Sequence, residues 1–139
     1  ARDIGMTCPF LGGDGWDGLE GYATADQLKD AYFCANYAKG SNPDFENAYK
    51  EEYGEEYPNG FAPLGYDAAM TVVYGLQAAE DAGLEAGSDE YKQAVIDAIA
   101  SGTINGITGT FTFDEHHDPV KQTAILCFDG ETPVLKEMF

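Results

Sequence analysis

The chain has 139 residues, 44% of them hydrophobic, and its 7 Lys and Arg stand against 25 Asp and Glu, a formal net charge of −18. This length suits one domain with a core of its own. So acidic a surface repels nucleic-acid phosphates and anionic membranes, which excludes nucleic acid as a partner and favours cationic or zwitterionic ligands.

The start of the chain lacks the charged and apolar pattern of a signal peptide. The sequence also has no run of about 18 apolar residues, the length needed to cross a membrane. Ala1 to Gly5 is typical of the last turn of a helix closed by a glycine. We therefore expect the chain to be a fragment of a longer protein.

The first third of the chain alternates between strands and short helices. Thr7 to Gly12 predicts a short buried strand, and Gly13 to Gly21 predicts a loop after it. Thr24 is the expected N-cap of a short helix that ends at Lys29. The apolar and aromatic stretch from Ala31 to Tyr37 predicts a second strand.

Three helices are predicted next. Asn42 and Pro43 are typical of an N-cap and first helical residue, and Gly54 ends that helix. Its apolar side chains recur at helical spacing: Phe45, Ala48, Tyr49 and Tyr53.

The stretch from Tyr57 to Phe61 predicts a turn, and a long helix follows from about Pro63 to Ala82. Ser88 is expected to cap a third helix, which Gly102 closes. The side chains expected to face the core are Tyr66, Ala69, Met70, Val73 and Leu76 in the long helix, and Tyr91, Val95, Ala98 and Ile99 in the third.

The last third changes to the alternating period of strands. Thr108 to Phe113 alternates, with Phe111 and Phe113 on one face. Gln122 to Phe128 predicts a strand, Asp129-Gly130 a hairpin turn, and Pro133 to Lys136 a closing strand. Helices and strands thus both contribute to one α/β fold.

The cysteines and histidines give no motif for a metal, a cofactor or catalysis. Cys8, Cys34 and Cys127 are an odd number without CxxC spacing, in apolar runs, which predicts buried structural thiols. His116 and His117 are adjacent and would point to opposite faces, which suits a solvated hairpin tip better than a zinc site.

Two further acidic groups are candidate sites. Asp14, Asp17 and Glu20 do not meet the spacing of an EF-hand calcium loop. A hydrolase using Asp114 with the two histidines is the one enzymatic alternative that the sequence leaves. We expect no cofactor, no metal and no enzyme activity.

The candidate binding site lies in the glycine-rich stretch after the first strand, where Gly13, Asp14, Gly15 and Trp16 follow one another. Glycine allows close approach of a ligand, and open α/β sheets bind small molecules where their strands end. A carboxylate beside an indole suits a small cation with an apolar part. The alternative is an ordinary acidic turn.

Several stretches together resemble the C-terminal portion of type I periplasmic solute-binding proteins, in particular the Leu/Ile/Val receptors of branched-chain amino-acid ABC transporters. The resemblance covers nearly the whole chain. It is carried, in order, by Phe10–Trp16, Phe45–Lys50, Tyr53-Gly54, Phe61 with Leu64–Ala69, Ile107–Asp114 and Asp118–Lys121.

The resemblance implies a Rossmann-like, three-layer α/β/α fold of two lobes that close over one ligand and are linked by three crossing strands. Residues 1–31 would belong to the second lobe, and residues 32–37 would form a crossing strand. Residues 38–106 would supply helices of the first lobe. Residues 107–139 would return to the second lobe as a strand and a hairpin.

The resemblance also implies roles for the candidate site. Asp14 would hold the α-ammonium of the ligand by charge-assisted hydrogen bonds, and Phe61 would line the pocket for its side chain. Gly13 and Gly15 would let the backbone approach, and Trp16 would pack on the ligand or cover it. The family's carboxylate-binding groups lie in an N-terminal half that this sequence lacks, so the chain would hold one side of a clamp.

The implied function is that of an amino-acid receptor for an ABC importer, with the transporter permease as partner. The protein would be periplasmic or extracellular and anchored as a lipoprotein. A ligand-sensing regulatory or receptor domain of the same fold is the alternative. A fragment exposes sheet edges and apolar helix faces, so we expect a homodimer, formed by exchange of elements between copies.

Overall fold

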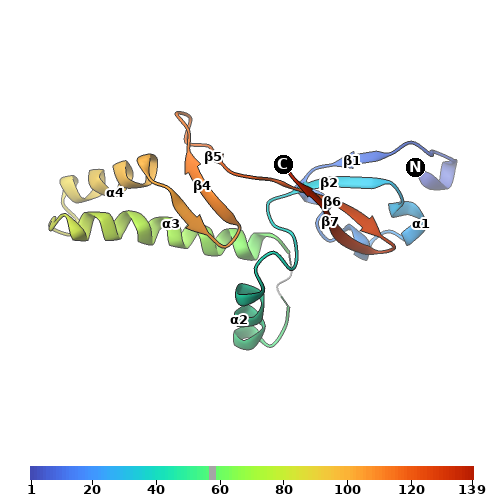
Figure 1. The fold of residues 1–139 in the computed structure, drawn as a ribbon, viewed down its shortest axis with the longest axis horizontal. Coiled ribbons are helices and arrows are strands. Elements are labelled where there is room, and N and C mark those ends of the chain that lie inside the picture. Colours follow the sequence, from blue (N-terminus) through green and yellow to red (C-terminus); the bar gives the residue numbers. More distant parts are fainter. Residues whose placement is uncertain (57–58) are drawn as a thin grey trace. The chain divides into compact units, whose positions relative to one another are not determined.

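The computed structural model describes residues 1–56 and 59–139 and is mixed α/β, as the sequence predicts (Figure 1). The chain forms two compact units. Unit 1 comprises Ala1–Ala62 and Gln122–Phe139, and unit 2 comprises Pro63–Lys121. The assignment of these parts to two lobes and a crossing strand stays a prediction.

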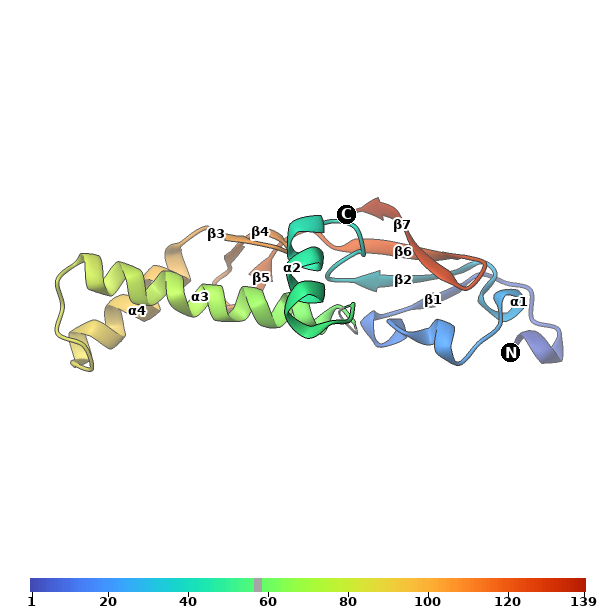
Figure 2. The ribbon, with the colours of Figure 1, turned by 90° about the horizontal axis from the view of Figure 1, so that it is seen from below.

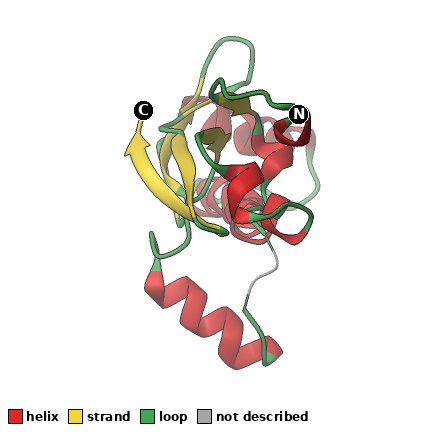
Figure 3. Cartoon of the chain, turned by 90° about the vertical axis from the view of Figure 1, so that its right-hand side faces the viewer, coloured by secondary structure: helices red, strands yellow, loops and turns green. Residues whose placement is uncertain are grey.

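Unit 1 is built on a four-stranded sheet in the order β1-β2-β6-β7 (Figure 1). The strands are β1 (Phe10–Gly12), β2 (Ala31–Ala35), β6 (Ala124–Asp129) and β7 (Thr132–Met138). β1 runs parallel to β2, whereas β2, β6 and β7 are antiparallel neighbours. Figure 3 shows these strands side by side in yellow.

The core of unit 1 lies on one face of this sheet. Phe33 of β2 stands opposite Leu126 of β6, and both side chains are buried. The ring of Phe128 stacks on Phe33 with the centroids 5.4 Å apart, and Trp16 packs against the same cluster. Alternate residues of β2 face the core, so the strand fixes which face is covered.

Unit 1 also contains short helical elements before and after its first two strands and between them. They are the 3-10 helices η1 (Arg2–Ile4), η2 (Asp14–Trp16) and η3 (Leu19–Gly21), and the α-helices α1 (Ala25–Leu28) and α2 (Pro43–Tyr53).

The predicted caps of these helices are confirmed. The Asn42 side chain accepts the Phe45 N–H at 3.1 Å at the start of α2. Gly5 and Gly54 close η1 and α2 at φ 87° and 74°, where a side chain would be strained.

Unit 2 pairs two helices with a small sheet (Figure 2). The helices are α3 (Phe61–Asp81), whose first two residues belong to unit 1, and α4 (Asp89–Ser101). The strands β3 (Ile104–Gly106), β4 (Gly109–Phe113) and β5 (Pro119–Val120) follow as an antiparallel sheet in that order. The N-cap at Ser88 is confirmed, since its hydroxyl accepts the Tyr91 N–H at 3.1 Å.

α3 and α4 approach closely at Gly75. A Cβ atom added there would lie 2.9 Å from side-chain atoms of both Val95 and Ile99. The two helices are also joined by the Tyr91 hydroxyl, which donates to Glu80 at 2.9 Å. The close approach therefore requires a residue without a side chain at position 75.

The prediction of which face of α3 is buried is wrong. Tyr66, Met70, Val73 and Leu76 are between 39% and 50% exposed, and Ala69 is exposed as well. The buried residues of α3 are Pro63, Asp67, Gly75 and Ala79, spaced on another face of the helix. The cause is the small residues, because they let α4 and the β3–β4 turn come close, and the larger apolar side chains remain outside.

The prediction of three buried thiols is also wrong here. Cys8 and Cys34 are exposed and Cys127 is half-buried, all as free thiols. Cys34 lies on the face of β2 opposite to Phe33, where Tyr32 is half-buried. β1 is likewise shorter than predicted and has no buried residue.

Several boundaries differ from the sequence predictions. β2 ends at Ala35 rather than Tyr37, and α3 begins at Phe61 rather than Pro63. The short strands β3 and β5 were not predicted, because two or three residues carry too little periodicity. The predicted turn at 57–61 lies partly outside the described residues, since Tyr57 and Pro58 are not among them. Among the described residues, no helix combines the length and apolar character of a membrane span.

Candidate functional site

The loop after β1 is held in a 3-10 turn that presents Asp14. The Trp16 N–H donates to the Gly13 carbonyl at 3.1 Å, and the Asp17 N–H donates to the Asp14 carbonyl at 3.0 Å. The Asp14 side chain is exposed. An exposed carboxylate at the second residue after a strand end is able to receive a cationic group without a large desolvation cost.

Trp16 lies against the sheet. A Cβ atom added at Gly12 would be 2.2 Å from the indole ring, so the ring occupies the space over this glycine. The indole is half-buried and packs on the core cluster around Phe33 and Leu126. Trp16 thus packs part of its indole against the core of unit 1. The rest of the indole is accessible beside the loop.

Gly13 and Gly15 are not required by packing in this chain. A Cβ atom added at either position would meet nothing within 4 Å. Gly13 has φ −95° and ψ −171°, an extended conformation that any residue adopts. The space beside both glycines is therefore open to a ligand or to another part of the protein.

Phe61 directly follows Gly60, whose backbone is hydrogen-bonded to Asp17 of the same loop in unit 1. The Gly60 N–H donates to Asp17 Oδ2 at 2.7 Å, and the Phe61 N–H donates to the Asn59 side chain at 3.0 Å. Phe61 is 65% exposed at the first position of α3. The structure thus ties the chain just before Phe61 to the loop that carries Asp14.

Asp17 and Glu20 are more prominent than the sequence suggested. Both line a cavity of about 170 Å³ in unit 1, together with Lys39, Asn59 and the apolar side chains of Leu126 and Leu135. The Oε2 atom of Glu20 is buried and has no hydrogen-bond partner within the described part of the chain. Asp14 does not line this cavity. No sequence motif distinguishes Asp14 from Asp17 and Glu20 in this respect.

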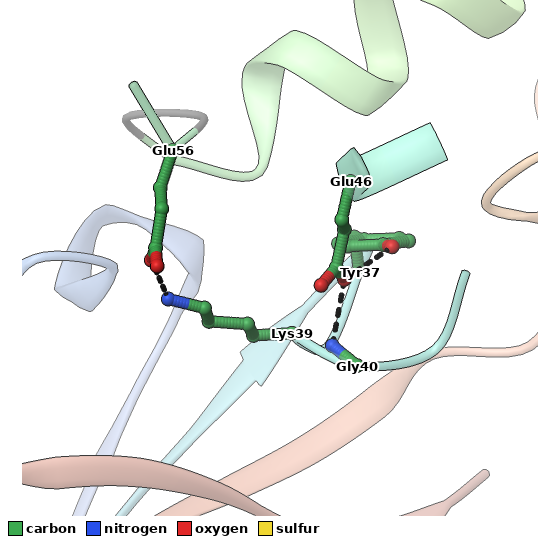
Figure 4. Close-up of polar contacts among 5 residues, drawn as sticks. All are labelled: Tyr37, Lys39, Gly40, Glu46 and Glu56. Carbon is green, nitrogen blue, oxygen red and sulfur yellow. Dashed lines mark hydrogen bonds and ion pairs between the residues drawn. The ribbon is translucent and has the colours of Figure 1, made fainter. Parts of the chain in front are cut away.

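A polar cluster at the end of β2 was also missed (Figure 4). The Tyr37 hydroxyl donates to Glu46 Oε1 at 2.7 Å and accepts the Asn42 N–H at 3.0 Å. The Gly40 N–H donates to the same Glu46 oxygen at 2.6 Å. Burial, reinforced by the neighbouring Glu46 carboxylate, raises the pKa of Tyr37 well above its usual value. The cluster joins β2 to α2 with a neutral tyrosine at its centre.

Asp67 is the buried carboxylate of unit 2. It is 3% exposed and accepts hydrogen bonds from the N–H groups of Ile107 and Thr108, at 2.7 and 3.0 Å, and from the Thr108 hydroxyl at 2.5 Å. Lys121 contacts the same hydroxyl, and burial lowers the pKa of this lysine. Asp67 pins the β3–β4 turn to α3, so its role is structural.

The acidic histidine segment is a backbone turn. Asp114 Oδ1 accepts the N–H groups of His116 and Asp118 at 2.8 and 3.0 Å. His116 Nε2 is 3.7 Å from Glu115, and both side chains are exposed. Across residues 1–56 and 59–139, no three His, Cys, Asp or Glu side chains converge as a metal site.

The chain as a whole is similar to one known protein family. A family model described as periplasmic binding protein matches residues 1–131. No curated protein matches the chain.

Several solved structures match nearly the whole chain. The leucine-binding protein LivK of Thermotoga maritima is 24% identical, with a TM-score of 0.72, over 99% of this chain and 39% of its own. LivJ of Streptococcus pneumoniae, solved with isoleucine, is 26% identical, with a TM-score of 0.70, over 99% of this chain and 38% of its own.

A solute-binding protein of R. palustris, solved with benzoate, is 22% identical, with a TM-score of 0.68. The match covers 94% of this chain and 35% of that one. The chain thus spans less than two fifths of the length of these three proteins.

Proposed function

The chain belongs to the periplasmic binding protein family, and from this premise we propose that it is the C-terminal part of an amino-acid receptor for an ABC importer. The α/β fold and the family indicated by the sequence motifs are confirmed. The single observation that carries the proposal is the loop after β1, where the exposed Asp14 carboxylate stands between two glycines beside open space. Relatives of known structure are solute-binding proteins.

In this proposal Asp14 receives the ammonium group of the solute. The carboxylate makes charge-assisted hydrogen bonds to the ammonium, and Gly13 and Gly15 let the solute approach the backbone. The free surface of Trp16 and the exposed ring of Phe61 supply apolar contact. Groups that bind the solute's carboxylate come from the part of the receptor outside this chain.

The charge of Asp14 favours an amino acid over a simple carboxylate. LivJ was solved with isoleucine, and the R. palustris protein with benzoate. A benzoate-like anion would be repelled by an unpaired carboxylate, whereas an α-ammonium would be attracted. We therefore expect a branched-chain or similar amino acid as the solute.

The test is a thermal-shift screen of the full-length receptor against the amino acids. A solute at about 100 times its Kd stabilises the protein by about 2.7 kcal/mol. Asp14→Ala should abolish this shift, and Gly13→Ala should weaken it because the added methyl occupies the space for the solute. Glu52→Gln on α2 is the control and should bind normally. The 139-residue chain alone should not bind the same amino acid at micromolar concentration in calorimetry.

A shift with an anionic solute, retained in the Asp14 variant, would refute the assignment of Asp14 and leave the fold unaffected. The alternative function is a ligand-sensing regulatory or receptor domain of the same fold. Loss of solute uptake on deletion of the gene favours the transport receptor, and loss of a transcriptional or signalling response with normal uptake favours the sensor. In either case we propose an exported, lipid-anchored protein without catalytic activity.

The proposed homodimer rests on exposed apolar surface. Tyr66, Met70 and Val73 are each at least 40% exposed on α3. Association of two copies would cover this face, against the repulsion of two chains that each carry −18. Because salt screens this repulsion, light scattering of the 139-residue chain should show a dimer fraction that increases with salt concentration. A monomer at every protein concentration would refute the proposed homodimer.

A further inference from the structure

The chain contains two Asn-Gly dipeptides, Asn59-Gly60 in unit 1 and Asn105-Gly106 in unit 2. In such a dipeptide the backbone nitrogen of the glycine is able to attack the side-chain carbonyl carbon of the asparagine, because glycine has no side chain to obstruct the ring that forms. The attack expels ammonia, and water then opens the ring to leave a carboxylate. The two dipeptides have different surroundings, so we expect them to react at different rates.

The backbone nitrogen of Gly60 lies against a carboxylate. Its N–H donates to Asp17 Oδ2 at 2.7 Å, a distance typical of a charge-assisted hydrogen bond. A carboxylate in this position is placed to take the N–H proton as the nitrogen attacks, which is general-base catalysis. Asp17 is therefore positioned to activate the nucleophile of the reaction.

The carbonyl group that would be attacked also has a hydrogen-bond donor in place. The Phe61 N–H donates to Asn59 Oδ1 at 3.0 Å. Negative charge develops on this oxygen as the Gly60 nitrogen adds to the carbon, and a donor that is already oriented stabilises that charge. The same hydrogen bond restrains the asparagine side chain close to its own backbone, which holds the reacting groups near each other.

The cavity of about 170 Å³ in unit 1 gives access for the small molecules of the reaction. Asp17, Asn59 and Gly60 all line it. A cavity holds a water molecule when it offers about 10–15 Å³ and polar partners, and this cavity has both. It therefore has space for the water that opens the ring and for the ammonia that leaves.

The second dipeptide is held in a paired strand. Asn105 stands opposite Thr110, and Gly106 opposite Gly109, in the pairing of β3 with β4. The Thr110 hydroxyl donates to Asn105 Oδ1 at 3.0 Å, so the asparagine side chain is engaged across the strands. Ring closure there requires this part of the sheet to open locally. Asn105-Gly106 is thus an internal reference for Asn59-Gly60.

We propose that Asn59 is a site of self-catalysed deamidation, with Asp17 as the base and the Phe61 N–H as the donor to the developing oxyanion. The Gly60 nitrogen forms a bond with Asn59 Cγ while Asp17 takes its proton. The bond from Cγ to the side-chain nitrogen breaks, and the departing NH₂ group takes that proton and leaves as ammonia. The product is a five-membered succinimide, and water adds to one of its two carbonyl groups to give aspartate or isoaspartate.

The modification changes the loop that promotes it. A carboxylate at position 59 lines the same cavity as Asp17, and two carboxylates at close range repel each other. Isoaspartate also lengthens the backbone by a methylene group directly before Gly60. Both effects weaken the hydrogen bond from Gly60 to Asp17 and release the segment before Phe61 from the loop.

The experiment measures both dipeptides by peptide mass spectrometry after incubation of the 139-residue chain at neutral pH. One sample is folded and the other is unfolded in guanidinium chloride. Asn59 should deamidate at least about 10-fold faster in the folded chain than in the unfolded chain, since the base acts only when the loop is formed. Asn105 should show the opposite order, because the strand pairing protects it.

Two variants test whether the carboxylate acts as the base. Asp17→Ala should slow deamidation of Asn59 in the folded chain at least about 10-fold and leave Asn105 unchanged. Glu20→Gln is the matched control, because it removes a carboxylate that lines the same cavity, whereas the Gly60 N–H donates to Asp17. It should leave the rate at Asn59 unchanged. The thermal midpoint of each variant checks its folding.

An equal or lower rate at Asn59 in the folded chain would overturn the proposal, because the structure would then not promote the reaction. Equal rates in Asp17→Ala and the unaltered chain would overturn it as well, and so would an equal loss in Glu20→Gln, which would show an effect of charge alone. If Asp17→Ala does not fold, the comparison of the folded with the unfolded unaltered chain decides. None of these outcomes depends on the proposed solute.

Discussion

Asp67 allows the packing of unit 2 to be tested with one substitution. Its buried carboxylate accepts three hydrogen bonds from Ile107 and Thr108. Asp67→Asn replaces one acceptor oxygen by an amide that is itself a donor, so at least one buried N–H or hydroxyl loses its acceptor. A buried hydrogen bond to a charged group contributes about 1.5–3 kcal/mol.

We expect Asp67→Asn to lower the free energy of unfolding by about 2–4 kcal/mol and Asp67→Ala by about 3–5 kcal/mol. At about 3 °C per kcal/mol for a chain of this size, the Asn variant should melt about 6–12 °C lower. The loss belongs to unit 2, which contains both partners of the carboxylate.

The assay is urea unfolding followed by two signals. Far-UV circular dichroism follows α3 and α4, which are the longest helices, and fluorescence follows Trp16, the one tryptophan of the chain, in unit 1. The dichroism midpoint should move more than the fluorescence midpoint. Asp81→Asn is the control on the same helix, because Asp81 is exposed and accepts an exposed hydrogen bond from Gln77, at 2.8 Å.

A change within about 0.5 kcal/mol is expected for the Asp81 control. If Asp67→Asn and Asp81→Asn unfold at the same urea concentration, the three hydrogen bonds do not hold the β3–β4 turn to α3. The reasoning about buried acceptors in this unit would then be wrong.

Two further predictions concern unit 1. The folded chain holds the proton of Tyr37 at pH values where the unfolded chain loses it, since the pKa of Tyr37 is raised in the folded state. The free energy of unfolding should therefore fall above about pH 10, by about 1.4 kcal/mol per pH unit for this group. Tyr37→Phe should lower stability by about 1–2 kcal/mol at pH 7 and show a shallower fall above pH 10 in urea titrations at several pH values; parallel curves for the two proteins would contradict the prediction. Gly12→Ala should displace the Trp16 ring, red-shift its fluorescence and cost about 1–3 kcal/mol, because the added Cβ would lie 2.2 Å from the indole. Gly13→Ala, where a Cβ meets nothing within 4 Å, is the matched control, and equal losses in the two variants would show that the indole does not occupy the space over Gly12.

Local signals were sufficient for the helix ends of this chain. The N-caps at Asn42 and Ser88 and the glycine at position 54 act within three or four residues, so the sequence states them fully. The hairpin at Asp129-Gly130 is of the same kind, with Gly130 at φ 65°. Such features depend on no distant partner and were predicted correctly.

The candidate site likewise has a part that depends on local sequence and a part that depends on distant residues. The turn that exposes Asp14 is local, and the glycine pattern indicated it. The cavity lined by Asp17 and Glu20 depends on Asn59 and on Leu135 of β7, which are about 40 and 115 residues away in the sequence. No periodicity connects such positions, so in the sequence these two carboxylates stand out only as part of an incomplete calcium loop.

α3 shows why periodicity identifies a helix more reliably than the face it buries. Two faces of this helix are able to pack: the larger apolar residues such as Met70 and Val73, and the small residues Gly75 and Ala79. The spacing of large apolar residues points to the first face. It reflects the free energy of burying each side chain and not how closely two helices are able to approach. The second face packs in this chain because small residues admit α4 and because Asp67, on the same side, is satisfied by the β3–β4 turn. Within this unit, the face that packs is therefore better indicated by a buried acid in line with small residues at four-residue spacing. The face of larger apolar residues indicates a surface with room for a further partner.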